Sequence, residues 1–366
     1  MKRIIIFIIT LLGFAFPVFA EDAPVTGESS SETFKSENYI PDEVQNILKE
    51  NNVDINSPQT VKDVLGLVSN AIKAVFSEFS EKIALLLIIT VFVSLFYKFI
   101  DNNTFKTIIS YIITLTILVV IFDIIKKMLL NATAALTSIS EILSAVTPAF
   151  SAVLLMGGST FTAFTQSASF ATVIALLNLI IDSLLLPCLS VIAFVLIFEK
   201  LSPQFSELNI LKFLKKNTIT VIVFITMIML TVISYQHIIS AGKDSVSGRT
   251  VKFAAANFIP IVGAAFGESL RTLGAGVKYL KNTVGGAVAL SLIITVLPVI
   301  LQTFLLKIYF NFLSFSSGLL SCKGEQGLFD ASVSLLDIIN AIIICSLVLS
   351  LLLVITFVLS VFPIST

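Results

Sequence analysis

Long apolar stretches separated by short polar segments dominate the chain. Six of them approach or exceed the roughly 20 residues that a membrane-spanning helix needs, namely 83–100, 107–125, 168–198, 218–239, 284–306 and 338–362. A shorter stretch, 142–156, contains Pro148 and need not cross. A helix satisfies its backbone hydrogen bonds within its own segment, as a lipid environment requires. The pattern therefore predicts an all-α polytopic membrane protein with about six to eight membrane segments.

The first 82 residues have a different character. Residues 1–20 carry Lys2 and Arg3, then an apolar stretch, then Val18-Phe19-Ala20, which is typical of a signal peptide that is either cleaved or kept as an anchor. Residues 21–82 contain twelve acidic and five basic residues, and we expect them to form an acidic extracytoplasmic segment. From Ser57-Pro58 an amphipathic helix is predicted, either packed on the membrane domain or lying along the outer leaflet. Residues 83–366 form the predicted transmembrane domain.

One apolar block, 168–198, is too long for a single straight crossing. It would extend about 45 Å as a helix, against a hydrocarbon core of about 30 Å, and Pro187 is the expected kink. Asp182 lies inside the block, and Asn178 precedes it by one helical turn. We expect this polar stripe to face the bundle interior, because an intramembrane Asp costs about 2.5–3.5 kcal/mol. An ion or proton relay, a pore lining and a hydrogen-bonded helix contact are all compatible with it; the helix contact is favoured.

Just before this block, residues 157–167 are small, polar and uncharged. Irregular backbone at membrane depth is tolerated only where protein buries it or where it lines a cavity. We therefore expect this segment to be enclosed by other helices or to line a cavity.

The most informative polar segment is 241–283. Its basic residues outnumber its acidic ones by six to two, and it encloses an apolar stretch, 253–266. Counting spans from an outside N-terminus places residue 241 outside, which conflicts with the positive-inside rule. Either 254–270 crosses or re-enters the membrane, or an earlier block is a hairpin. Arg249 and Lys252 cannot rest in hydrocarbon, so we expect them to contact a partner protein or lipid headgroups.

Composition agrees with this class and narrows the chemistry. Hydrophobic residues make up 56% of the chain, charged residues 13%, and mean hydropathy is +1.02. This excludes an ordinary soluble enzyme and a nucleic-acid binder. The chain has one histidine and three well-separated cysteines, and no CxxC, HExxH, GxSxG or Walker A motif. We therefore predict no enzyme activity, no catalytic residues, no cofactor and no metal site.

Within 241–283 the sequence resembles a known family. Ser247-Gly248-Arg249-Thr250-Val251-Lys252-Phe253, Asn257-Phe258-Ile259-Pro260-Ile261-Val262-Gly263 and Lys281-Asn282-Thr283-Val284-Gly285 resemble the stage III sporulation protein AE family of endospore-forming bacteria. Asn257, Pro260, Gly263 and Asn282 are signature positions here, without a known ligand. The resemblance also covers the signal peptide, the acidic segment and the order of the later spans.

The resemblance implies a sporulation role in the mother-cell membrane around the forespore. Family members act with the other SpoIIIA membrane proteins and with SpoIIQ, in an assembly proposed to be a secretion-like channel or feeding conduit. It implies no catalytic residues and no nucleic-acid partner. Two alternatives remain open from the sequence, a stand-alone secondary transporter for a small solute and a purely structural anchor for ring-forming partners.

Overall fold

The chain folds into long helices. The computed structural model describes residues 40–50, 66, 69, 73, 77, 79–93, 103–185, 187, 210–258, 263–319 and 323–360. Within these residues every regular element is helical, which confirms the all-α prediction. The elements, besides helical residues 79–93, are α2 (Asp42–Glu50), α4 (Asn103–Met156), α5 (Thr160–Ile180), the π-helical turn η2 (Ile181–Leu185), α8 (Ile210–Phe258), α9 (Gly263–Leu319) and α10 (Lys323–Leu359). Residues 1–39, including the predicted signal peptide, lie outside this description.

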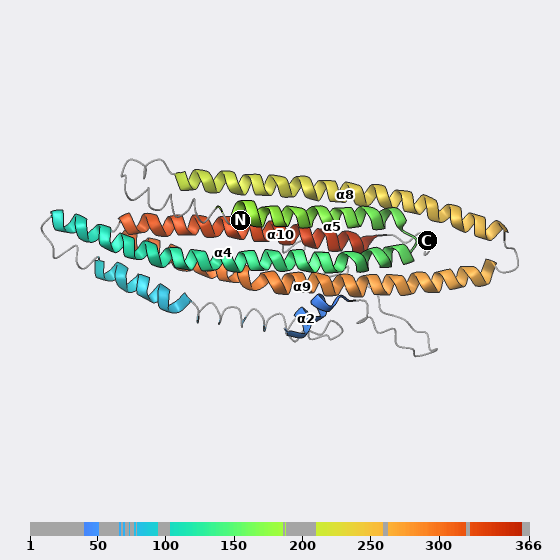
Figure 1. The fold of residues 1–366 in the computed structure, drawn as a ribbon, viewed down its shortest axis with the longest axis horizontal. Helices are drawn as coiled ribbons and strands as arrows, with labels where there is room; N and C mark the ends of the chain where they lie inside the picture. The colour runs from blue at the N-terminus through green and yellow to red at the C-terminus, as the bar shows by residue number, and fades with distance from the viewer. Residues whose placement is uncertain are drawn as a thin grey trace.

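The central helix of the bundle is α10, which packs against α4, α5, α8 and α9 (Figure 1). After Asp337 it carries no charged residue, and 72% of its most hydrophobic 18-residue window is buried. A helix that is hydrophobic on all sides belongs in the middle of a bundle. Aromatic contacts join α10 to α4 and α4 to α5: the Phe357 ring stacks on Phe150 of α4 at 3.6 Å between centroids, and Phe150 meets Phe170 of α5 edge-on at 5.6 Å.

The helices α9 and α10 approach each other closely at Gly285. A Cβ atom at this position would lie 2.3 Å from Cγ2 of Val358, so no larger residue fits without movement. Small residues at such crossings let two helix backbones come together. The glycine of the Lys281-Asn282-Thr283-Val284-Gly285 motif is thus explained by packing.

Several predicted segments merge into longer helices. The helix α4 has 54 residues, or about 81 Å at 1.5 Å per residue, and includes both 107–125 and 142–156. Pro148 lies within it without ending it. The helix is continuous through the polar pair Lys126-Lys127 that separates these stretches. Lys126 is exposed and Lys127 half-buried, while Ile125 and Met128 face the core.

The number of membrane segments is lower than predicted. Within the described residues four helical segments are long and apolar enough to cross a membrane: Thr160–Ser183, Lys215–Val246, Leu280–Leu319 and Glu325–Leu359. The estimate of six to eight was too high for this part of the chain. It counted 107–125 and 142–156 separately, and it included 83–100, of which the structure describes only the first part.

The segment 241–283 contains no separate membrane crossing in the described structure. The helix α8 continues without interruption to Phe258, and α9 starts at Gly263. Both extend beyond the neighbouring ends of α4, α5 and α10 (Figure 1). Of the two alternatives left open by the sequence, a separate crossing at 254–270 is not seen in the described residues, because 254–258 belong to α8 and 263–270 to α9.

Candidate membrane-embedded interface

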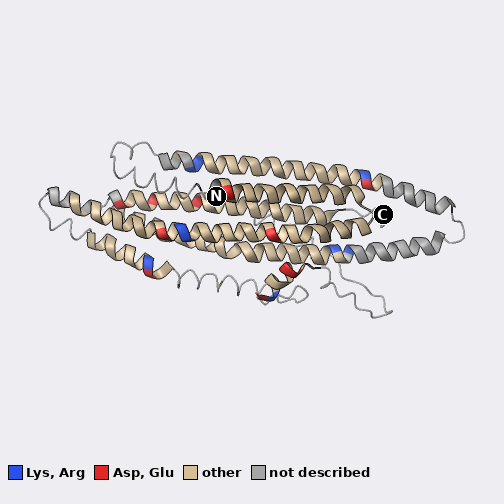
Figure 2. Cartoon of the chain, in the orientation of Figure 1, with Lys and Arg blue, Asp and Glu red and all other residues tan. Residues whose placement is uncertain are grey.

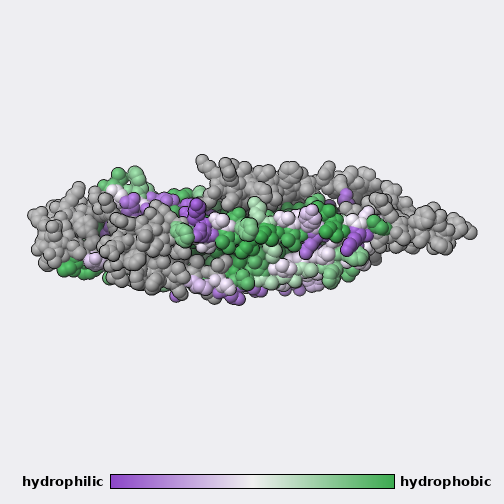
Figure 3. Space-filling model, turned by 90° about the horizontal axis from the view of Figure 1, so that it is seen from above, coloured by the Kyte–Doolittle hydropathy of each residue, from purple (hydrophilic) through white to green (hydrophobic). Residues whose placement is uncertain are grey.

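A belt without charged side chains runs across the bundle. The helix α8 has no Lys, Arg, Asp or Glu between Lys216 and Lys243, and α9 has none between Lys281 and Lys307. In α10 the charge-free stretch runs from after Asp337 to the helix end. The stretches are about 33–39 Å long, which matches a bilayer with a hydrocarbon core of about 30 Å and its interfacial layers. Figure 2 shows charged residues near both ends of these stretches, and it also shows charged residues of α2 and α4 between those ends. In Figure 3 hydrophobic residues predominate on the described surface between the hydrophilic groups.

A buried ion cluster fixes one edge of the belt. Asp337 of α10 forms ion pairs with Lys215 of α8 and Lys307 of α9. The carboxylate is only 2% exposed, whereas the two lysine side chains are 29% and 20% exposed. One acid therefore joins three helices at the same level, and both lysines reach solvent in part.

The opposite edge is fixed by two other buried charges. Asp244 of α8 accepts hydrogen bonds from the backbone N–H groups of Phe161 and Thr162, at 3.0 and 2.8 Å, in the first turn of α5. This helix start has no side-chain cap of its own, because Ser159 makes no such bond. Lys281 of α9 donates to the carbonyl of Ser360, at 2.6 Å, where α10 has just ended. These contacts join α8 to α5 and α9 to α10, so that the charge-free stretches of these helices lie at the same level.

The polar residues of α5 bond to three different neighbours. Thr165 and Ser169 contact Ser240 and Gln236 of α8, each at 2.7 Å. On other sides, Gln166 donates to the carbonyl of Leu353 in α10 at 2.8 Å, and Ser167 bonds to Ser151 of α4 at 2.7 Å. The small polar segment 157–167 is thus a turn, with Gly158 at φ 79°, followed by two helical turns. Thr162 and Gln166 are buried, whereas Phe161 and Phe164 are 48% and 76% exposed. The expectation that other helices enclose this segment therefore holds for one face only.

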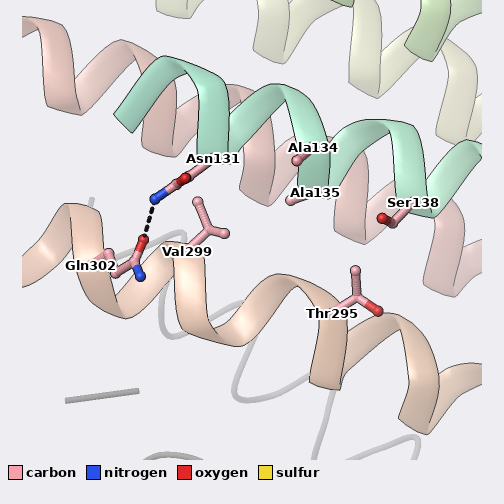
Figure 4. A pocket seen from close by; sticks show the side chains of 7 residues that line it. All are labelled: Asn131, Ala134, Ala135, Ser138, Thr295, Val299 and Gln302. Carbon is pink, nitrogen blue, oxygen red and sulfur yellow. Dashed lines mark hydrogen bonds between the residues drawn. The ribbon is translucent and has the colours of Figure 1, made fainter. Parts of the chain in front are cut away.

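An open groove lies between α4 and α9 within the belt. It has a volume of about 420 Å³ (Figure 4). From α4 it is lined by Asn131, Ala134, Ala135 and Ser138. From α9 it is lined by Thr295, Val299 and Gln302, and Asn131 donates to Gln302 at 3.0 Å across it. Small side chains therefore form the floor of the groove, and the polar side chains that line it carry no charge.

Glu141 is the one acidic residue at belt depth in α4. It is exposed, and it lies two helical turns after Ala134 on the same side of the helix. Within the described residues it has no ion pair. The groove and Glu141 together form a polar surface where the bundle would otherwise face hydrocarbon.

The predicted polar stripe in α5 is placed differently from the expectation. Asn178 and Asp182 are both exposed, and Asp182 lies in the π-helical turn η2 at the edge of the belt. Asn178 accepts a hydrogen bond from Ser140 of α4 at 3.3 Å. The prediction that this stripe is buried in the bundle is wrong for the single chain. The reason is that the second half of α5, from Val173 to Ile180, is apolar apart from Asn178, so its sequence pattern does not define an inner face.

Comparison with known proteins identifies the family. A family model described as stage III sporulation protein AE matches residues 40–362. The chain belongs to this family. Stage III sporulation protein AE of Bacillus subtilis (strain 168) is 27% identical over 230 residues, which cover 62% of this chain and 57% of that protein. The match thus spans a little over half the length of that relative. No solved structure matches the chain.

The family signature residues gather in the hairpin of α8 and α9. Arg249, Lys252 and Asn257 lie in the part of α8 beyond the belt, and Gly263 is the first residue of α9. Asn282 lies at the belt edge of α9 and is half-buried. Pro260, and the side chains of 247–258, lie outside the described residues. The hairpin group lies more than about 31 Å from Asp182 along the bundle, because Asp244, which precedes the hairpin, holds the opposite end of α5.

Sequence reasoning missed the contacts that hold the belt of this chain together. The partners in the ion cluster are 122 and 30 residues apart, and Asp244 is 83 residues from Phe161. The sequence did contain a usable signal, namely the charged residues at the ends of apolar stretches. These are Lys215, Asp244, Lys281, Lys307 and Asp337. Within the described residues, no group of three or more His, Cys, Asp or Glu side chains could hold a metal ion.

Proposed function

We propose that this chain is a non-enzymatic, multi-pass component of the SpoIIIA–SpoIIQ channel complex that links mother cell and forespore. It would reside in the mother-cell membrane around the forespore and support forespore development during sporulation. The observation that carries the proposal is the family match over residues 40–362, which includes the whole belt and the hairpin.

The hairpin of α8 and α9 supports a role as a complex subunit. Its arms extend past the membrane-spanning segments that end at Val246 and begin at Leu280. Residues 247–258 and 263–279 continue as helix for about 18 and 25 Å. The arms carry Arg249, Lys252, Arg271 and Lys278 against one acid, Glu268. A basic arm beyond the hydrocarbon suits an acidic surface on a partner protein.

The second candidate, a stand-alone solute transporter, is less well supported. Secondary transporters commonly bind their substrate at broken helices near the midplane. In the described part of this chain α8, α9 and α10 are continuous through the belt, and the π-helical turn after α5 lies at the belt edge. Pro298 lies within α9 without dividing it.

Replacing Arg249 and Lys252 together by Ala tests the proposal. We expect normal membrane insertion but reduced co-purification of the SpoIIIA proteins and SpoIIQ from sporulating cells. A matched control replaces Lys126 and Lys216, two exposed lysines near the other belt edge, by Ala. If the hairpin variant recovers its partners fully and sporulates normally, the hairpin is not the contact. If the wild-type chain recovers none of these proteins, the proposed function is wrong.

A further inference from the structure

We propose that the groove between α4 and α9 receives a transmembrane helix of a different membrane protein. This inference deepens the proposed function, because it names a surface through which the subunit joins others inside the bilayer. It does not involve the hairpin beyond the belt. It rests on the depth, the polarity and the shape of the groove.

The depth of the groove follows from the nearby charges. Gln302 lies five residues from Lys307, and Thr295 lies twelve residues from it, in the middle of the charge-free stretch of α9. Asn131 lies four residues beyond Lys127 on α4. The groove therefore lies at the depth of the hydrocarbon layer, from near one edge of the belt to about its centre.

Polar groups in this groove lack partners within the described residues. The bond between Asn131 and Gln302 uses one amide hydrogen and one carbonyl oxygen. It leaves the Oδ1 atom of Asn131 and the Nε2 group of Gln302 available, and Ser138 has no bond through its hydroxyl (Figure 4). Lipid tails cannot bond to such groups, and polar groups left unpaired in hydrocarbon are costly. A helix with hydroxyl or amide side chains would satisfy them.

The shape of the groove suits a helix rather than a lipid chain. Ala134, Ala135 and Ser138 form a small floor, over which another helix backbone can come close. Helices in membranes associate through such small-residue surfaces and through hydrogen bonds between side chains. An acyl chain would fill the same space without bonding to Asn131 or Gln302.

Charge complementarity indicates a different protein rather than a second copy. Glu141, exposed beside the groove, calls for a basic side chain or a strong hydrogen-bond donor on the visiting helix. The belt portions of α4, α5, α8, α9 and α10 carry no Lys or Arg. A second copy would thus offer no Lys or Arg from these portions. The partner we infer has small residues along its contact line and a basic residue or an amide level with Glu141.

Site-specific photocrosslinking tests this inference. A benzophenone side chain placed at Ser138 of the full-length protein is irradiated in membranes of sporulating cells, and the adducts are identified by mass spectrometry. We expect a covalent adduct that maps to a predicted transmembrane segment of another protein. The variant Ala134→Leu, which fills the groove, should reduce the adduct yield about three- to tenfold.

Two further variants keep the test clear. Ala168→Leu adds the same bulk at an exposed alanine of α5 outside the groove and should leave the yield unchanged. Gln302→Leu removes the amide without filling the groove and should also lower the yield. Adducts with lipid alone, adducts with a second copy, or a yield insensitive to Ala134→Leu would each overturn the inference. If SpoIIIA proteins co-purify without this adduct, the groove assignment fails and the proposed function stands; if none co-purifies, the proposed function fails.

Discussion

Removal of the Asp337 carboxylate should destabilise the bundle more than any surface charge change. The variant Asp337→Ala deletes both ion pairs of a 2% exposed acid and leaves Lys215 and Lys307 without their counter-ion. Breaking a buried pair costs about 3–5 kcal/mol. Because the two lysines are 29% and 20% exposed, they can turn toward water, so we expect the lower end, about 3 kcal/mol.

The lysines should behave non-additively. Lys215→Met or Lys307→Met alone leaves Asp337 one partner and should cost about 1 kcal/mol each. Both together leave a buried carboxylate unpaired and should cost at least about 3 kcal/mol, more than the sum of the single changes. Lys216→Met, at the exposed neighbouring lysine, is the control and should change stability by less than about 0.5 kcal/mol.

The assay is unfolding of the purified protein by sodium dodecyl sulfate in mixed micelles, followed by helical circular dichroism. Asp337→Asn keeps one acceptor oxygen and should fall between wild type and Asp337→Ala. The reasoning is refuted if Asp337→Ala unfolds within about 0.5 kcal/mol of wild type, or if the two lysine changes are simply additive.

Four other changes test separate parts of the description. Asp244→Ala removes two bonds to the start of α5 and should cost about 2 kcal/mol, with faster hydrogen exchange at the first amides of that helix. Gly285→Ala, against Val358, should cost about 1–3 kcal/mol in the same unfolding assay, whereas Gly242→Ala, with open space around it, should be neutral or stabilising. Asp182→Asn should preserve sporulation at normal protein level; failure would indicate a charge-dependent role. Mature protein should start at Glu21 by N-terminal sequencing, and alkaline phosphatase fused after residue 75 should be active; an inactive fusion would refute the outside placement.

The class of protein was accessible from the sequence because hydrophobicity determines it directly. The apolar stretches 218–239 and 284–306, and the described helical part of 338–362 up to Leu359, lie within long helices of the bundle. The motifs of 241–283 were sufficient to indicate the family that the comparison then confirmed. Each of these predictions depends on local sequence, where the pattern is strong.

The helix boundaries and the facing of side chains were harder to predict. The stretches 107–125 and 142–156 were counted separately, yet one helix includes both, because the side chains of Lys126 and Lys127 can leave the core from its surface. Asp182 was expected inside because burial in protein usually shields an intramembrane acid, but the apolar residues around it do not reveal which side of the helix is inside. Contacts such as Asp244 with α5 depend on which helices become neighbours, and local periodicity does not encode that.

The unbroken course of α8 has a mechanical consequence. This helix extends about 74 Å, from Ile210, just outside the charged edge of the belt at Lys215, to Phe258 beyond the other edge, and no proline interrupts it. A stiff rod that pivots near the bilayer centre moves its two ends in opposite directions, and a tilt of about 5° displaces each end by about 3 Å. A protein that pulls on the tip from one side of the membrane would therefore strain the ion pair between Lys215 and Asp337 on the other side.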